Sequence, residues 1–173
     1  MRARAGSSLR TAGQRHTAPI LAAVSDLLVR LYDLPPPRVV GGVDVRRALP
    51  PEKHAVSVWV RDTFGHRWAS ESEIAFAHQP VGCHVALRES SVLGFACWDA
   101  TARGFFGPIG TLESERRKGI GAALLLECLH AMAAHGYGYA VIGAAGPKAF
   151  YERVVEVLEI PGSVPGIFRG LLR

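Results

Sequence analysis

The stretch that decides the fold is Arg116-Arg117-Lys118-Gly119-Ile120-Gly121, which joins an apolar strand pattern to the longest helix pattern of the chain. The strand pattern, 105–112, is interrupted by Gly107 and Pro108, and a proline within a strand predicts a bulge or an unpaired edge. The helix is expected over 119–135, where apolar residues recur at every fourth position. A basic, glycine-containing turn therefore lies between a distorted strand and a long helix.

This turn has the chemistry of a diphosphate-binding loop. Gly119 and Gly121 let the backbone approach a ligand closely. The first N–H groups of the following helix lack internal acceptors, and the helix dipole favours an anion at that end. Arg116, Arg117 and Lys118 add positive charge beside it. The sequence contains neither a P-loop pattern nor a Rossmann glycine pattern, so the alternative is an ordinary basic turn before a surface helix.

The remaining patterns predict short strands interspersed with helices. Strands are expected at 26–32, 43–48, 83–88, 92–99, 139–142, 155–160 and 167–172, and helices at 50–64, 68–78 and 148–153. Short polar turns between consecutive strands favour antiparallel hairpins. The predicted fold class is therefore α/β (α+β), with a mixed sheet rather than a doubly wound parallel one.

Length and charge limit the domain organisation and the partners. The 173 residues suffice for one domain, expected over 25–173, and a second full domain would be cramped. The net charge of +5 falls to about +1 without the four arginines of residues 1–24, so no specific nucleic-acid binding is expected. Residues 1–24 are expected to be a disordered basic leader, with a transit-type leader or an overlong start as alternatives. No window approaches the ~18 consecutive apolar residues of a membrane span, so no membrane association is expected.

The cysteines and histidines predict neither disulfides nor a metal site. Cys83, Cys97 and Cys128 are odd in number and far apart in sequence, which indicates a reducing compartment and hence a cytoplasmic protein. Cys97 and Cys128 lie in apolar patterns and are expected to be core residues. His130 and His135 have the wrong spacing for one helical face, and no zinc motif is present in the sequence.

The chain resembles the GNAT superfamily of acetyl-CoA-dependent N-acetyltransferases, whose signature Q/R-x-x-G-x-G/A is matched by Arg116, Gly119 and Gly121. The resemblance covers roughly 43–172 and implies a mixed, mostly antiparallel sheet, split between its fourth and fifth strands and flanked by helices. Acetyl-CoA, as co-substrate, is expected to enter between the strands at 105–112 and 139–142. Matching offsets imply that its contacts come from Ile109, Gly110, Thr111, Arg116, Arg117, Lys118, Gly119, Ile120, Gly121 and Ala122.

A second match concerns catalysis. The segment Ala149-Phe150-Tyr151-Glu152-Arg153 resembles the family's F-Y-E-[KR] motif, in which the tyrosine often protonates the departing CoA thiolate. The resemblance implies this role for Tyr151, and the alternatives are a core aromatic residue or one that only packs on the cofactor. It also implies direct attack of a primary amine on the thioester in a ternary complex. The alternative function is a non-catalytic acyl-CoA-binding sensor or pseudo-enzyme of the same fold.

The acceptor amine has weaker signals. The family often has an acidic base, but the 105–112 strand contains no acid, so Glu71, Glu73 and Asp99 are the candidates, with solvated surface carboxylates as the alternative. Trp98 beside Asp99 suits a cationic amine. Aromatic residues expected around the acceptor groove, or else in the core, are Trp68, Phe76, Trp98, Phe105 and Phe106. The acceptor is expected to be a small-molecule or peptide amine, and the edges of the final strands could be covered in a homodimer.

Overall fold

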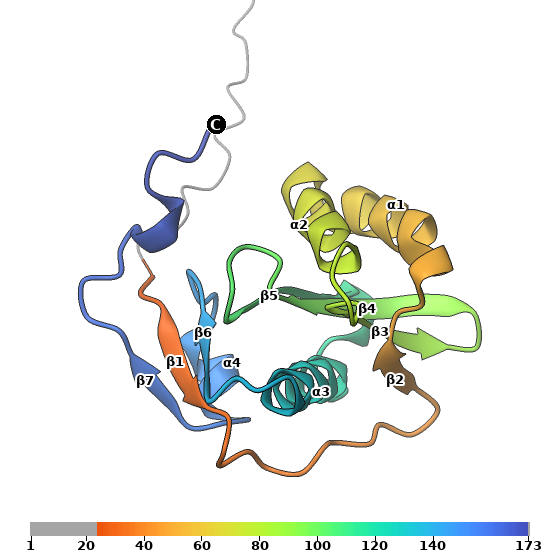
Figure 1. The fold of residues 1–173 in the computed structure, drawn as a ribbon. Helices are drawn as coiled ribbons and strands as arrows, with labels where there is room; N and C mark the ends of the chain where they lie inside the picture. Colours follow the sequence, from red (N-terminus) through yellow and green to blue (C-terminus); the bar gives the residue numbers. More distant parts are fainter. Residues whose placement is uncertain (1–23, 173) are drawn as a thin grey trace, which may run out of the picture.

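The computed structural model describes residues 24–172 and folds them around one sheet with the strand order β2-β3-β4-β5-β6-β1-β7 (Figure 1). The strands are β1 (Leu27–Arg30), β2 (Asp44–Arg47), β3 (Cys83–Arg88), β4 (Ser91–Trp98), β5 (Phe105–Thr111), β6 (Tyr139–Ile142) and β7 (Val157–Glu159). Neighbouring strands are antiparallel except β5 and β6, which are parallel. The predicted mixed, mostly antiparallel sheet is therefore confirmed.

Helices cover both faces of this sheet. The helices are α1 (Lys53–Phe64), α2 (His66–Phe76), α3 (Ile120–Ala134) and α4 (Lys148–Glu152), with 3-10 turns at Pro50–Glu52, Glu113–Glu115 and Gly166–Phe168. Helices α1 and α2 lie on one face, and α3 lies on the other with the short α4 beside it (Figure 1). The predicted helices are all present within a few residues of their expected bounds.

Glycines set the ends of the helices. Gly65 has φ of 99°, a left-handed value that ends α1, and its carbonyl accepts the N–H of Ala69 at 3.3 Å. Helix α2 therefore begins at His66 rather than at the predicted residue 68. Gly136, with φ of 97°, follows the last turn of α3 and ends this helix.

The core has two parts, one on each face of the sheet. Leu124, Leu125 and Leu129 of α3 are fully buried against one face, and Val60 and Phe95 lie in the cluster between the other face and α1–α2. Full burial of a side chain of this size contributes roughly 1.5–3 kcal/mol. Helix α3 is therefore held firmly against the sheet, and this fixes the position of its N-terminal turn.

The predicted strand over 167–172 is wrong. A 3-10 turn forms at Gly166–Phe168 instead, and the chain continues without regular structure to Leu172. Gly166 and Gly170 have φ of 59° and 79°, left-handed values that interrupt an extended strand. The apolar pattern that suggested a strand has a different cause, because several of these side chains line a cavity described below.

The remaining predictions concern the strand at 155–160, the N-terminal leader, membrane spans and a homodimer. The strand predicted at 155–160 is β7, three residues long at the sheet edge beside β1. The predicted leader, 1–24, lies outside the described residues except for Val24. Within 24–172, the helices are too short or too polar to cross a membrane. The homodimer through the final strands remains a prediction.

The packing of α3 gives a first test. Replacing Leu124, which has no exposed surface, by alanine is expected to lower the free energy of unfolding by about 2–5 kcal/mol, because a cavity is left in the core. The matched change Leu172→Ala removes a side chain that is 91% exposed, and is expected to alter stability by less than about 0.5 kcal/mol. Urea unfolding of both variants measures the difference, and equal effects would show that α3 does not anchor the fold.

Candidate functional site

The sheet opens between β5 and β6. Their parallel pairing joins Phe105 to Val141 and Phe106 to Ile142, after which the two strands diverge (Figure 1). Strand β5 continues along β4, whereas β6 ends and its chain turns away toward α4. The split predicted between these two strands is therefore present.

A bulge in β5 begins where the strands diverge. On β4 one residue separates Ala96 from Trp98, whereas on β5 the two residues Gly107 and Pro108 separate the partners of these residues. Gly107 has φ of 120°, which side-chain-bearing residues rarely adopt. Pro108 has no N–H to contribute to the ladder. The bulge predicted from Pro108 is confirmed.

The bulged strand directs into the split backbone groups that no strand within 24–172 pairs. The N–H of Leu112 donates to a β4 carbonyl at 2.9 Å. Because alternate residues of an antiparallel strand bond to the same neighbour, Gly110 also directs its polar groups at β4. Ile109 and Thr111 consequently direct their N–H and C=O groups to the other side, where β6 has diverged. These groups are available to an extended ligand lying along β5.

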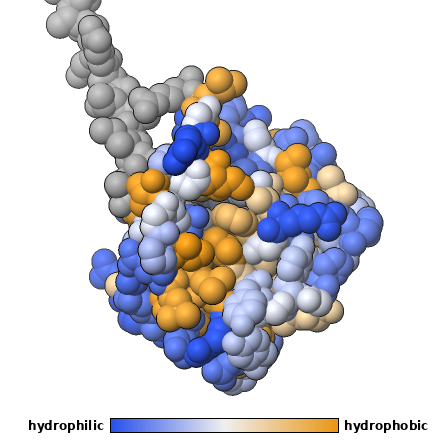
Figure 2. All heavy atoms as spheres, turned by 60° about the vertical axis from the view of Figure 1, so that its left-hand side comes forward, coloured by the Kyte–Doolittle hydropathy of each residue, from blue (hydrophilic) through white to orange (hydrophobic). Residues whose placement is uncertain are grey.

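A cavity of about 1050 Å³ occupies the split and continues onto the α2 face of the sheet. It is lined by Phe105–Thr111, Arg116, Gly121, Ile142–Ala144, Gly146, Pro147, Phe150 and Tyr151, and on the α2 side by Phe64, Arg67, Trp68, Ser70, Glu71, Ala100, Thr101, Ile167, Phe168 and Leu171. We call the part between β5 and β6 the split lobe and the part beside α2 the α2 lobe. Figure 2 shows hydrophobic side chains gathered over a hollowed part of one face, with hydrophilic surface around them.

The predicted cradle borders the split lobe. Gly119 has φ of 90° and precedes the first turn of α3, which has no side-chain cap. The first intrahelical bond runs from Ala123 to Gly119 at 3.0 Å, so the N–H groups of Ile120, Gly121 and Ala122 have no acceptor within the helix. A Cβ on Gly121 would lie 3.4 Å from the Phe150 ring, so larger side chains would fill this end of the cavity.

The three basic residues of the turn are placed differently. Arg116 lines the cavity, and its guanidinium lies 4.0 Å from Glu113. Lys118 is an ion-pair partner of Glu115 at 3.2 Å. Arg117 is exposed, with φ of 63°, and does not line the cavity. Arg116 is therefore the basic side chain of this turn best placed to reach a diphosphate.

Glu115 holds the turn in position. Its carboxylate accepts two bonds from the Arg88 guanidinium, at 3.1 and 3.0 Å, in addition to the ion pair with Lys118. These bonds, with that to Arg88 the strongest influence, lower the pKa of Glu115, so it remains ionised. The contact ties the turn before α3 to the end of β3.

Tyr151 borders the split lobe opposite the cradle. It is 6% exposed and its ring lies 5.0 Å from that of Phe150, edge to face. Burial raises the pKa of Tyr151 to about 12. Among residues 24–172, no side chain or carbonyl bonds to its hydroxyl, which leaves the proton free for a ligand. The Tyr151 hydroxyl can therefore donate a hydrogen bond to a ligand in the cavity at neutral pH.

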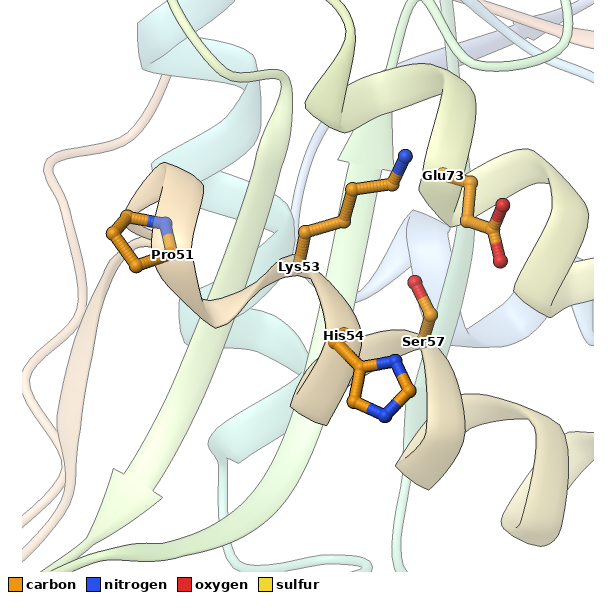
Figure 3. A pocket seen from close by; sticks show the side chains of 5 residues that line it. All are labelled: Pro51, Lys53, His54, Ser57 and Glu73. Carbon is orange, nitrogen blue, oxygen red and sulfur yellow. The ribbon is translucent and has the colours of Figure 1, made fainter.

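Of the two glutamates on α2, the structure brings one to the cavity. Glu71 lines the α2 lobe, and its Oε1 accepts the Thr101 hydroxyl at 2.5 Å. Glu73 lies instead on a separate pocket of about 450 Å³ between α1 and α2, together with Lys53 and Ser57 (Figure 3). None of the side chains of that pocket lines the larger cavity. Residues two positions apart on a helix point to different sides, which explains why Glu71 reaches the cavity and Glu73 does not.

Trp98 and Asp99, expected at the acceptor site, lie elsewhere. Trp98 is 1% exposed and packs in the core beside His135, with ring centroids 5.3 Å apart. Asp99 accepts the Gly104 N–H and the Tyr137 hydroxyl, each at 2.7 Å, which closes the turn between β4 and β5. Strand alternation explains this: Trp98 directs its side chain to the α3 face of β4, away from the α2 lobe.

The other expected aromatic residues divide in the same way. Trp68, Phe105 and Phe106 line the cavity, whereas Phe76 is buried in the core between α2 and the sheet. Phe64, Phe150 and Phe168 also line the cavity, as does Arg67. None of these four residues was predicted to belong to the site. Phe64 closed a helix pattern, and Phe168 lay in a segment predicted as a strand.

Metal chemistry has no candidate in the described part of the chain. No group of three histidine, cysteine, aspartate or glutamate side chains is placed to hold an ion within 24–172. Cys83, Cys97 and Cys128 are buried free thiols. Burial raises the pKa of Cys97 and of Cys128 well above the usual thiol value, so neither is an activated nucleophile.

Comparison with known proteins gives a family match. The model of the acetyltransferase (GNAT) family matches residues 53–155, more than half of the chain. This range includes α1, α2, the bulged β5, the cradle and Tyr151. No curated protein sequence matches the chain.

Solved structures share the fold. A glucosamine N-acetyltransferase region of a fungal multi-domain GH3 β-N-acetylglucosaminidase matches with a TM-score of 0.64 and 16% identity over 79% of this chain and 20% of that one. A GCN5-related N-acetyltransferase from Sphaerobacter thermophilus matches with a TM-score of 0.58 and 20% identity, over 84% of this chain and 45% of that one. A GCN5-related N-acetyltransferase from Kribbella flavida matches with a TM-score of 0.56 and 23% identity, over 82% of this chain and 60% of that one. The chain thus spans a fifth to three fifths of these structures' lengths, and the likeness concerns the fold.

The burial of Tyr151 predicts a pH dependence of stability. Its folded pKa of about 12 lies above the ordinary 10.0, so the contribution of the buried phenol is complete below pH 10 and is lost as pH rises toward 12. Between pH 10 and pH 12, the free energy of unfolding of the wild type is expected to fall more steeply with pH than that of Tyr151→Phe. The difference between the two slopes is expected to reach about 1.4 kcal/mol per pH unit. Chemical denaturation across this range measures the difference, and parallel curves would contradict the burial of this phenol.

Proposed function

Because the chain belongs to the GNAT acetyltransferase family, we propose that it transfers the acetyl group of acetyl-CoA to a primary amine. The observation that carries the proposal is the continuity of one cavity from the cradle, through the split and past Tyr151, to the carboxylate of Glu71. This continuity supports the proposal, because a diphosphate site, an extended channel, a proton donor and a group for a cation would then follow one another along one cavity. The acceptor is a small-molecule or peptide amine.

The geometry supports specific contacts to the cofactor. The free N–H groups of Ile120, Gly121 and Ala122 would bind the diphosphate, with Arg116 beside them. The open backbone edge of β5 at Ile109–Thr111 would bond the amides of the pantetheine arm, much as a further strand would. The residues present therefore fit the group that the family uses.

The chemical step needs the amine to attack the thioester carbonyl. A carbon–nitrogen bond forms, the carbon–sulfur bond breaks, and the proton lost by nitrogen is the one that sulfur gains. The bound thioester supplies the activated acetyl group. Backbone N–H groups near the bulge would polarise its carbonyl oxygen. Holding both reactants in the same cavity contributes much of the remaining acceleration.

Tyr151 would act at the departing sulfur. Its hydroxyl keeps its proton because burial raises its pKa to about 12. A free thiol has a pKa of about 8.5, so leaving a buried phenolate behind after donation is unfavourable. Donation to sulfur would therefore be coupled to reprotonation of Tyr151 by the proton that the amine releases, directly or through water. Tyr151 is thus a proton relay rather than a simple acid.

Binding of acetyl-CoA tests the cradle. The wild type is expected to bind it with a micromolar Kd, and Gly119→Trp to weaken binding by at least about tenfold, because a bulky side chain would obstruct the N-terminus of α3. Gly136→Trp is the matched control: Gly136 also has positive φ, at the other end of α3, with open space around it. Calorimetry on all three chains measures the Kd. If the folded wild type did not bind acetyl-CoA, the proposed function would be wrong.

Turnover tests Tyr151. Tyr151→Phe is expected to lower kcat for acetyl transfer by at least about 100-fold while leaving the Kd for acetyl-CoA unchanged. Tyr139→Phe, at a residue that is 50% exposed and outside the cavity, is expected to retain full activity. CoA release in the presence of amines measures both. Binding of acetyl-CoA without transfer to any amine would favour the alternative, a non-catalytic acyl-CoA sensor.

A further inference from the structure

The α2 lobe has a chemistry of its own, and from it we infer the class of acceptor. We propose that the acceptor is a monoamine whose nitrogen is carried by an apolar body, such as an arylalkylamine. The inference rests on the proposed function, because it names the second substrate of the same cavity. Three observations carry it: an aromatic wall, one oriented carboxylate, and the balance of charge around the lobe.

The first part of the aromatic wall is held rigidly by packing on the α2 side. The Trp68 ring lies 5.2 Å from Phe64 and 6.1 Å from Phe95, centroid to centroid. Phe64 in turn lies against the backbone of Gly110, where a Cβ would approach its ring to 2.6 Å. Trp68 therefore presents a fixed face to the lobe. Such a surface favours a flat apolar group over a hydrated polar one.

The second part of the wall comes from the opposite side of the lobe. Phe105 and Phe168 lie against Gly143, where a Cβ would be 3.0 Å from one ring and 3.5 Å from the other. Leu171 follows in the same segment, which Arg67 bonds through the carbonyl of Leu172 at 3.3 Å. The lobe thus lies between aromatic side chains from both directions, with room for an apolar body between them.

Glu71 supplies the group that an ammonium needs. Among the described residues that line the cavity, it is the one acidic residue. The Thr101 hydroxyl donates to its Oε1 at 2.5 Å, whereas no donor among residues 24–172 bonds its Oε2. One oxygen is therefore fixed and the other is open to a ligand. A carboxylate held in this way can bind a cationic amine and take a proton from it before attack.

The charge of the lining favours a single amine. Arg67 lines the α2 lobe beside Glu71, whereas Arg116 lies in the split lobe, so the described lining of the α2 lobe has one acid and one base. A polyamine or a lysine-rich peptide would bring further positive charges toward Arg67, with no second acid among the described lining residues to receive them. A monoamine on an apolar body satisfies Glu71 and leaves the aromatic wall to bury the remainder.

An acceptor comparison tests the class. With saturating acetyl-CoA, the full chain is expected to acetylate 2-phenylethylamine with a kcat/KM at least about tenfold above that for spermidine or for a lysine-containing peptide. A preference for spermidine or the peptide would overturn the inference while leaving the acetyltransferase function intact. Calorimetry with acetyl-CoA distinguishes the two failures, since loss of cofactor binding would overturn both.

Variants test the two parts of the lobe separately. Trp68→Ala is expected to raise the KM for 2-phenylethylamine about tenfold with the KM for acetyl-CoA unchanged, and Trp68→Phe is expected to restore most of the loss. Glu71→Gln is expected to lower kcat/KM by at least about tenfold, most strongly at low pH, where the amine is protonated. The control Glu73→Gln changes the same residue type two positions away, outside the cavity, and is expected to have no effect.

The two variants also guard against a purely structural effect. Loss of stability at Trp68→Ala would change both substrates' constants together, whereas loss of the acceptor wall changes the amine's KM alone. Equal losses in Glu71→Gln and Glu73→Gln would show that the carboxylate in the lobe has no special role. Either of these results would overturn the assignment of the α2 lobe to an apolar amine.

Discussion

The candidate site depends on the early end of pairing between β5 and β6. A closed sheet would satisfy the backbone groups of β5 on both sides and leave no room for a ligand. Here the ladder stops after Phe106 and Ile142, next to the bulge at Gly107–Pro108, and β6 ends while β5 continues along β4. The same distortion opens the cavity and leaves the backbone of Ile109 and Thr111 without a neighbouring strand. One local constraint therefore creates both the space and the groups that line it.

Packing on both faces keeps this opening in shape. On the α2 face, Phe64 lies so close to Gly110 that no side chain fits between them. On the other face, Phe150 contacts the start of α3 at Gly121. Helix α3 itself is anchored by a row of fully buried leucines. The unpaired edge of β5 is thus supported by contacts that do not use its open hydrogen-bonding groups.

The parts foreseen from the sequence are those encoded locally. Gly119 lies directly before α3, as the helix pattern predicted, and Pro108 marks the bulge because its ring removes a ladder bond. Trp98 shows a limit of local prediction, because the sequence around it does not reveal which face of β4 its side chain occupies. The segment after Gly166 shows another limit, since apolar residues that line a cavity give the same short pattern as a strand. In both cases long-range packing decided what local pattern could not.

The two lobes of the cavity differ in how the chain builds them. One side of the split lobe comes from consecutive elements, β5 and the turn into α3, and the other side comes from β6 and α4. The α2 lobe is assembled from α2, the β4–β5 turn and the C-terminal segment, which contact one another only through side chains and a few bonds such as Thr101 to Glu71. If the α2 lobe binds the acceptor, as we propose, substitutions at Trp68 or Phe168 would reshape the acceptor side without moving the cradle. The fold would then separate acetyl-CoA binding from the choice of amine.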